Sequence, residues 1–569
     1  MSEEIKSRNF IEQIIEEDLE KGFPKDKLRF RFPPEPNGYL HIGHAKAICL
    51  NFGLGEKYQA PVNLRFDDTN PVKEEQEYVD AIRKDIEWLG YQWDKECYAS
   101  DYFQQLYNWA IQMIQDGKAY VDDQSSEIIN QQRGIPSKPG IESPYRNRSV
   151  KENLDLFEKM QNGDVEESSK VLRAKIDMNS SNMFMRDPVM YRILKENHHR
   201  TGSKWNIYPM YDWAHGESDY IEQISHSLCS LEFKHHRPLY DWYLDQVYDI
   251  SKVRNKQREF ARGNVEYMIT SKRKLTKLIE EKIVSGWDDP RMPTISGLRR
   301  RGYTPESIKI FWEKVGIAKR DNVIDISLLE YAIRDHLNQT APRVMAVLDP
   351  LKIVITNYSE EQEEILIAEN SPNEEDHSTR EVPFSRELYI EKEDFKEEAG
   401  RKFFRLALGK EVRLKNAYII KAERCDKDEN GNVTTVYCTY DSESKSGSGT
   451  EASKRKVKGT LHWVSIKHTE KAEVRIYDRL FSDPAPDTHK DENGKPIDFM
   501  NFLNQNSIKT ITGYAEPYLK NADVGNQFQF QRLGYFVVDP DSTNTKKVFN
   551  RTVTLKDTWV KMNDNNTVR

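Results

Sequence analysis

The feature that most constrains the fold is an alternation of short apolar runs with longer amphipathic stretches between residues 28 and 121. Leu28–Phe32 and Val62–Phe66 are rich in β-forming apolar residues, which indicates buried strands. Ile42–Glu56 carries apolar residues at helical spacing, which predicts a helix. Strands alternating with helices imply right-handed crossovers and a parallel, doubly wound sheet. The other elements expected here are strands at Tyr91–Trp93 and Ala119–Val121 and helices at Val72–Leu89 and Tyr102–Gln115.

The connection between the first strand and the first helix has the composition of an anion site. Residues 33–38 read Pro-Pro-Glu-Pro-Asn-Gly, a turn that no regular element crosses, and His41-Ile-Gly-His44 opens the helix. The free N–H groups and the positive dipole of a helix start attract anions. Both imidazoles, three positions apart, can face one anion, and Gly43 lets a base or ribose approach the backbone. Asp67-Asp68 ends the second strand at the same rim, where ligands of doubly wound folds bind.

Two changes of pattern divide the rest of the chain. Prolines and glycines interrupt the alternation after residue 122, which predicts an insertion; the second half of the fold is expected to include a strand at Trp205–Tyr211 and a helix at Ser218–Leu228. After Thr340, short runs at regular spacing indicate β-barrels. The predicted fold class is therefore α/β plus β, multidomain. Its expected parts are an N-terminal helix (1–27), a split Rossmann-like catalytic domain (28–121 and 205–275), an inserted domain (122–204), a helical subdomain (276–340) and tandem β-barrels (341–569).

Charge distribution and cysteine usage narrow the functional classes. The net charge of −8 opposes a nucleic-acid partner at first sight, but basic clusters such as Lys272–Lys277, Arg299–Arg301 and Arg401–Lys415 provide local tracks for a polyanion. The five cysteines are scattered without Cys-x-x-Cys pairs, which argues against structural zinc and a disulfide framework. No apolar run approaches the length of a membrane span. We therefore expect a cytoplasmic protein with no zinc and no membrane contact.

Two short motifs carry a resemblance to a known family. The stretch from Pro33 to His44 resembles the first signature of the class I aminoacyl-tRNA synthetases, in the form that the glutaminyl and glutamyl branch has. Thr270-Ser271-Lys272 resembles the second signature, Met-Ser-Lys, with Thr270 in the place of the usual Met. The resemblance extends from about Leu28 to Thr558. It implies that the inserted domain binds the tRNA acceptor stem and that the β region binds the anticodon.

The resemblance implies an ATP-dependent ligase that forms an aminoacyl-adenylate and then charges a 2′-hydroxyl of the terminal tRNA adenosine. Such transfers depend on positioning and charge neutralisation. His41, His44 and Lys272, with Mg²⁺ between phosphate oxygens, would stabilise the leaving pyrophosphate and are the expected catalytic residues. The expected ATP contacts are Glu35, Pro36, Asn37, His41, Ile42, Gly43, His44, Ala45, Lys46, Ala47, Ser230, Arg262, Gly263, Thr270, Ser271 and Lys272.

The same resemblance assigns the amino-acid pocket. Asp67 is expected to hold the α-ammonium group and Tyr211 to contact the side-chain amide. Arg31 is expected near the carboxylate, with Cys229 in the pocket wall. A site that offers hydrogen bonds to an amide leaves groups unpaired when it meets a carboxylate, so these contacts would separate glutamine from glutamate.

Anticodon reading is assigned to the β region. RNA sequence is read on splayed, single-stranded bases by arginine stacking and by hydrogen bonds to base edges. The chain departs from the family at Lys402 and Phe404, where a Gln and a Lys are common. The expected anticodon contacts are Arg343, Arg405, Arg413, Gln529 and Arg532.

Three alternatives stay open. A glutamyl-tRNA synthetase with β-barrels would share Arg65–Pro71, although Tyr208–Asp212 and Ser225–Cys229 favour the glutamine side of the branch. A non-catalytic tRNA-binding paralogue would have no use for the histidine pair and Lys272. A small nucleotidylyltransferase would share His-x-Gly-His but not the long β region. The expected partners are tRNA(Gln), L-glutamine and ATP, the expected state is a monomer, and pyrophosphate exchange is expected to require tRNA.

Overall fold

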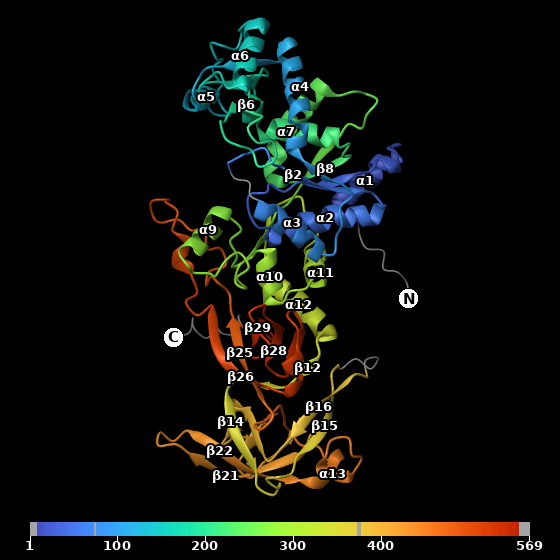
Figure 1. Ribbon diagram of the computed structural model, residues 1–569, viewed down its shortest axis with the longest axis vertical. Coiled ribbons are helices and arrows are strands. Elements are labelled where there is room, and N and C mark those ends of the chain that lie inside the picture. Colours follow the sequence, from blue (N-terminus) through green and yellow to red (C-terminus); the bar gives the residue numbers. More distant parts are fainter. Residues whose placement is uncertain (1–7, 73–75, 372–376, 557–569) are drawn as a thin grey trace. The chain divides into compact units, whose positions relative to one another are not determined.

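The computed structural model describes residues 8–72, 76–371 and 377–556, coloured along the chain in Figure 1. The chain divides into two compact units, of which the first comprises Met1–Asn264 with Trp312–Ile324 and the second Val265–Phe311 with Asp325–Arg569. The Ser271-Lys272 segment belongs to the second unit, and the domain limits expected at residues 275 and 340 stay predictions. Among the described residues, no helix is long and apolar enough to cross a membrane.

Five short strands form the parallel core of the first unit. They pair in the order β1-β2-β3 and, separately, β8-β9. The two groups meet beside β1, where the backbone N–H of Ser225 donates to the carbonyl oxygen of Arg29 at 3.0 Å. The strand order therefore reverses next to β1, which is where open α/β sheets bind ligands. The strands are β1 (Phe30–Phe32), β2 (Val62–Phe66), β3 (Glu96–Tyr98), β8 (His226–Ser230) and β9 (Lys256–Phe260).

The helices of the first unit begin at side-chain caps where the sequence offers them. Asn9 forms a capping box for α1 (Phe10–Glu20), which is the helix expected within residues 1–27; residues 1–7 lie outside the described part. His41 caps α2 (Ile42–Tyr58). The other helices are α3 (Gln76–Trp88), α4 (Phe103–Gln115), α5 (Ser126–Arg133), α6 (Val150–Asn162), α7 (Tyr211–Ile221) and α8 (Arg237–Val247).

Three expected elements differ in the structure. The strand expected at Tyr91–Trp93 lies at Glu96–Tyr98. The run Ala119–Val121 belongs to β4, which pairs antiparallel with β5, so the inserted sheet begins before residue 122. The helix expected at Ser218–Leu228 is α7, which starts and ends seven residues earlier; residues 213–220 are all buried, so no amphipathic period marked it. The inserted sheet consists of β4 (Ala119–Asp122), β5 (Val171–Ala174), β6 (Val189–Ile193) and β7 (Ile207–Pro209).

Two seven-stranded sheets of the second unit each close on themselves. In the order β12-β27-β28-β29-β25-β26-β13, the end strands are Arg343–Val344 and Ala346–Val347. In the order β23-β20-β21-β22-β14-β17-β24, they are Thr460–Leu461 and Val464–Ser465. Because one short segment forms both edges of each sheet, both sheets are barrel-like. The other strands are β14 (Pro350–Ile355), β17 (Glu387–Glu391), β20 (Glu411–Leu414), β21 (Ile419–Lys427), β22 (Val433–Asp441), β25 (Glu470–Tyr477), β26 (Ile508–Ala515), β27 (Gln527–Phe530), β28 (Gly534–Val538) and β29 (Lys547–Val553).

The remaining elements of the second unit include the segment after the second motif. In α9 (Lys272–Glu280), Leu275 and Leu278 are buried in an apolar cluster that includes Phe481. A hairpin of β15 (Glu364–Glu369) and β16 (Thr379–Phe384) forms a separate two-stranded sheet, and its Leu366, Val382 and Phe384 belong to the same buried core as strands β14 and β17. The other helices are α10 (Ile295–Arg301), α11 (Pro305–Val315), which crosses the border of the units, α12 (Ile326–Thr340) and the short α13 (Glu451–Lys454).

Candidate functional site

The start of α2 holds two histidines as a stacked pair. Their ring centroids lie 3.8 Å apart, with an interplanar angle of 28°. Nδ1 of His41 accepts a hydrogen bond from the N–H of Gly43, and Nδ1 of His44 accepts one from the N–H of His41, both at 3.1 Å. Each ring thus satisfies an N–H group that lacks an intrahelical partner. Because both Nδ1 atoms are acceptors, the proton of each neutral ring lies on Nε2, which is then a donor.

Burial keeps both imidazoles neutral. It lowers the pKa of His41 well below 6.5, an effect to which the neighbouring His44 adds. It also lowers the pKa of His44 to about 4. At neutral pH the pair therefore presents N–H donors without positive charge, which suits hydrogen bonds to phosphate oxygens.

We expect His44 to titrate near pH 4 in the ligand-free protein. Because folding depresses its pKa, the unfolded chain binds the proton more readily. The stability contributed by the neutral ring is therefore complete above pH 6.5 and decreases as the pH falls toward 4. NMR titration of the ring Cε1–H signals, assigned with the His44→Asn variant, measures the midpoint. A midpoint at the ordinary value of 6.5 would contradict the neutral pair.

A buried charge network surrounds Asp219 of α7. Nε of Arg31 donates to Oδ1 of Asp219 at 2.9 Å, and a terminal nitrogen of Arg65 donates to the same oxygen at 2.7 Å. The hydroxyls of Ser227 and Tyr240 donate to Oδ2 at 2.6 and 3.1 Å. Burial alone would raise the pKa of Asp219, but the two guanidinium groups hold it far below its usual range. The carboxylate is therefore the common acceptor of both arginines, and the buried Glu222, 3.2 Å from Arg65, supplies the second negative charge.

The guanidinium group of Arg31 has several hydrogen-bond partners within the protein. Besides Asp219, its guanidinium donates to the carbonyl of Leu228 at 2.9 Å and to the hydroxyl of Ser227 at 2.6 Å. Sγ of Cys229 lies 3.7 Å from the same group. With a fully buried side chain, Arg31 fixes β8 and the thiol of Cys229. Its contact with a substrate carboxylate stays a prediction.

A hollow of about 150 Å³ opens at the rim of the parallel strands. The ring of Tyr211 stacks on His215 with centroids 4.9 Å apart. Burial raises the pKa of Tyr211 well above 10, so its hydroxyl stays protonated, and burial lowers the pKa of His215 to about 3, so its ring is neutral. The hollow thus combines neutral hydrogen-bonding groups with two carboxylates and one guanidinium group. Its lining includes Glu35, Asn37, Asp67, Arg192 and Tyr211.

Among the residues expected at ATP, Lys46 has a contact within the protein instead. Its side chain is buried, and Nζ donates to the carbonyl oxygen of Ala261 at 2.7 Å. Burial lowers its pKa to about 8, although Asp321 opposes the shift. Lys46 therefore ties α2 to the segment at residues 261–263. The side chains of Ile42, Ala45 and Pro36 are buried as well.

The 261–263 segment and the end of β8 carry the other expected contacts of the first unit. Arg262 is exposed and pairs with Glu232, and the hydroxyl of Ser230 donates to the same carboxylate at 2.7 Å. Gly263 packs against Trp312, whose ring a Cβ at this position would overlap. A Cβ added to Gly43 would lie 3.7 Å from the carbonyl oxygen of Gly263, so the start of α2 and the 261–263 segment adjoin. Ser271 and Lys272 are exposed at the start of α9, in the second unit, with Thr270 half-buried before them.

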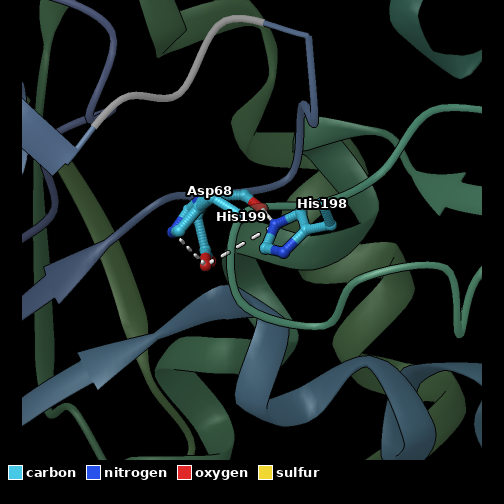
Figure 2. A group of neighbouring side chains, drawn as sticks. All are labelled: Asp68, His198 and His199. Carbon is cyan, nitrogen blue, oxygen red and sulfur yellow. Dashed lines mark hydrogen bonds and ion pairs between the residues drawn. The ribbon is translucent and has the colours of Figure 1, made fainter.

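Asp68, His198 and His199 form a cluster of the kind that binds metal ions, drawn in Figure 2. Their ligand-type atoms lie within 4.8 Å of one another. However, Nε2 of His198 donates to the backbone carbonyl of Asp68 at 2.7 Å, and Nδ1 accepts from two backbone N–H groups of the following loop. The hydroxyl of Ser100 donates to the Asp68 carboxylate at 2.6 Å. With both ring nitrogens of His198 engaged, the cluster fixes the backbone next to Asp67, and we assign no metal to it.

The residues expected at the anticodon fall into two groups within the second unit. Arg343 and Gln529 are paired in register on β12 and β27. Gln529 is 9% exposed, and its amide donates to the hydroxyl of Tyr535 at 2.9 Å. Arg343 donates to the side chain of Asn338 at 3.3 Å. These two expected contacts are therefore neighbours on one closed sheet.

Arg405 and Arg532 form the second group, around the buried carboxylate of Asp394. Arg532 donates to both oxygens of Asp394 at 2.6 Å. Arg405 lies 3.3 Å from the same carboxylate and pairs with Glu393 at 2.8 Å. Both arginines retain about a third of their side-chain exposure, at 36% and 31%. Asp394 therefore orients two cations that stay accessible.

Arg413 is separate from both groups. Its guanidinium donates to the carbonyl oxygens of Ser444 and Ser453 at 2.9 and 2.8 Å. Burial, together with the nearby Arg455, lowers its pKa. Arg413 thus holds the loop around residues 444–455 in place, and its contact with a base stays a prediction.

The sequence analysis missed several residues that organise these sites. Asp394 belongs to a short 3₁₀ turn, and Arg192 to a strand of the inserted sheet. His215 and Asp219 lie on a helix without an exposed face. Their spacing of four residues was the one available signal, because it places two polar side chains on the same side of a helix.

Family models match most of the chain. The model described as the catalytic domain of class I tRNA synthetases (E and Q) matches residues 27–339, and two models of the anti-codon binding domain of that class match residues 341–441 and 460–539. The chain thus belongs to the class I tRNA synthetases of the E and Q group.

Curated relatives narrow the assignment. The chain is 57% identical to the glutamine–tRNA ligase of Proteus mirabilis over 555 residues, which covers 97% of this chain and 98% of the relative. It is 55% identical to that of Rhodopirellula baltica, with 98% and 92% covered. It is 54% identical to that of Photobacterium profundum, with 99% and 100% covered. The chain belongs to the glutamine–tRNA ligase family.

Proposed function

We propose that the chain ligates L-glutamine to tRNA(Gln) through a glutaminyl-adenylate, with release of pyrophosphate and then AMP. The observation that carries this function is full-length similarity to glutamine–tRNA ligases at 54–57% identity. The hollow with Asp67 and Tyr211 beside the loop of Glu35 and Asn37 supports it. The glutamyl alternative is not favoured, because these relatives are named glutamine–tRNA ligases.

In the first step, the carboxylate of glutamine attacks the α-phosphorus of ATP. We infer that β1, β2, β3, β8 and β9 form one Rossmann-like sheet that positions ATP over the start of α2. His41 and His44 donate Nε2–H to phosphate oxygens, and Lys272 adds a positive charge as the pyrophosphate leaves. Arg262 and Ser230 complete the nucleotide site from the end of β8 and the adjoining segment.

We propose that Mg²⁺ binds together with the nucleotide. Mg²⁺ prefers oxygen ligands and is usually held by phosphates with one or two carboxylates. The histidine pair supplies N–H donors, so it fits phosphate oxygens and not the metal ion. Bound Mg²⁺ would neutralise phosphate charge. No described side chain is assigned as its ligand.

Glutamine is recognised by charge at one end and by neutral groups at the other. The opposite charges of Asp67 and Arg192 in one small hollow suit the ammonium and carboxylate of a free amino acid. Tyr211, which lines the hollow, keeps its proton and stacks on the neutral ring of His215. The charges of Arg31 and Arg65 are balanced by those of Asp219 and Glu222. Without an uncompensated cation there, the wall favours an amide over a second carboxylate.

Aminoacylation of tRNA(Gln) with glutamine and, separately, glutamate tests the function. Glutamine is expected to be charged, and preferential charging of glutamate would overturn the proposal. Pyrophosphate exchange with and without tRNA tests the order of binding, since we expect exchange only when tRNA is present. The expected monomer is measured by light scattering, and the proposed cytoplasmic location by fractionation of cells.

Replacing Asp67 by asparagine is expected to raise the KM for glutamine by about tenfold to a hundredfold. The change removes the negative charge that pairs with the α-ammonium group, and a hydrogen bond to a charged group contributes about 1.5–3 kcal/mol. Steady-state charging at saturating ATP and tRNA measures it, with Asp80→Asn as a control at an exposed carboxylate. An unchanged KM for glutamine would remove Asp67 from the pocket.

A further inference from the structure

The second unit contains a wide hollow with a basic wall and two aromatic lining residues, Phe403 and Phe404, of which Phe404 is the exposed one. Its volume is about 670 Å³. Phe404 lines it with 51% of its surface exposed. Nζ of Lys458 lies 5.4 Å from the centroid of the Phe404 ring. The basic residues of the lining are Lys396, Lys402, Arg405, Lys458 and Arg532.

The ring of Phe404 is held in place by its own backbone. Gly459 packs directly against the carbonyl of Phe404, where a Cβ on the glycine would collide with the oxygen. The next residue, Arg405, is fixed by Asp394 and Glu393. The ring therefore projects from a backbone that is anchored at its own carbonyl and at the next residue.

A hollow with this composition fits an unpaired nucleotide. Isolated exposed apolar side chains are ordinary on protein surfaces and by themselves indicate nothing. Here the exposed ring lies in a concavity with five cations and one acidic lining residue, Glu393. Nucleobases splayed from an RNA loop stack on aromatic side chains, while lysine and arginine neutralise the adjacent phosphates. Both parts of a nucleotide thus find complementary groups within one hollow.

We propose that Phe404 is a stacking platform for one base of the tRNA anticodon loop, with Lys402 and Lys458 on the flanking phosphates. The proposal rests on the function given above. Because every base has a π face, stacking on Phe404 would contribute affinity in addition to that of the hydrogen-bonding side chains. Arg405 and Arg532, held by Asp394, are left to contact base edges.

Fluorescence of 2-aminopurine, placed in turn at each anticodon position of a tRNA(Gln) anticodon stem-loop, tests the stacking directly. Binding to the full-length protein is expected to quench one of the three positions. Phe404→Leu should abolish that quenching and weaken binding by about tenfold to a hundredfold, the loss of one base–aromatic stack. Phe404→Trp should keep both. Ile367→Ala, at a side chain 60% exposed on β15, is the matched control and should change neither.

The salt dependence of RNA binding distinguishes the contribution of the Phe404 ring from that of the cations around it. Lys458→Ala should reduce the slope of log affinity against log salt by about one, whereas Phe404→Leu should leave the slope unchanged. Unaltered quenching and affinity in Phe404→Leu at all three positions would overturn the proposal, as would weaker binding with the quenching retained. Failure of the wild-type chain to charge tRNA(Gln) with glutamine would instead overturn the proposed function, so the two failures are distinguishable.

Discussion

Replacing His44 by asparagine is expected to lower the rate of glutaminyl-adenylate formation about a hundredfold while α2 stays folded. Asparagine can still accept the hydrogen bond that Nδ1 of His44 takes from the N–H of His41, so the helix start keeps its partner. What disappears is the Nε2–H donor that faces the phosphates in the proposed mechanism. Single-turnover adenylate formation in the presence of tRNA measures the rate.

His44→Gln is the matched control, because its amide nitrogen occupies a place closer to that of Nε2. It should recover part of the rate that His44→Asn loses. Equal losses in both variants would show that the ring acts through the helix and not on the phosphates.

The same rate tests whether the two motifs act on one triphosphate. His41 and His44 belong to the first unit and Lys272 to the second. If they stabilise the same leaving group, the effects of His44→Asn and Lys272→Ala should be strongly non-additive in the double variant. Strict additivity would contradict the joint action that the synthetase mechanism requires.

Replacing Asp219 by asparagine is expected to destabilise the first unit by about 3–5 kcal/mol, since it leaves the buried guanidinium of Arg31 without its counter-charge and that of Arg65 with Glu222 alone. Arg31 and Arg65 are 0% and 1% exposed, so water cannot substitute for the carboxylate. The hydroxyls of Ser227 and Tyr240 would lose an acceptor as well.

Hydrogen exchange of the α7 amides measures this loss locally, because a chain of two units does not unfold in a single transition. Asp80→Asn is the control. Asp80 also pairs with an arginine, but its side chain is 61% exposed, and such pairs contribute at most about 1 kcal/mol. Exchange rates in Asp219→Asn that match the wild type would show that the network is not what holds α7.

Much of the fold was predictable because local patterns specify it. Val62–Phe66 is a strand with the expected limits, and the helix expected from Ile42 begins there. Short, regularly spaced runs after residue 340 indicated closed sheets, and two are present. The pattern failed at α7, whose residues 213–220 are buried on every side and therefore carry no amphipathic period.

The site was predictable only in part. The histidine pair and the Asp67 rim follow from motifs that are contiguous in the sequence. No pattern in the sequence indicated that the head groups of Arg31 and Lys46 bind Asp219 and the carbonyl of Ala261, and their expected contacts with substrates stay predictions. Arg192, in turn, lines the hollow without any motif that marked it.

The family, the strand–turn–helix at the start of α2 and the kinds of side chain present there could all be inferred from the chain alone. These features depend on residues close together in the chain, whose spacing is visible in the sequence. Which polar groups neutralise one another became clear only from the folded chain. Arg31 and Asp219 are 188 positions apart, and folding alone brings such partners within hydrogen-bonding distance.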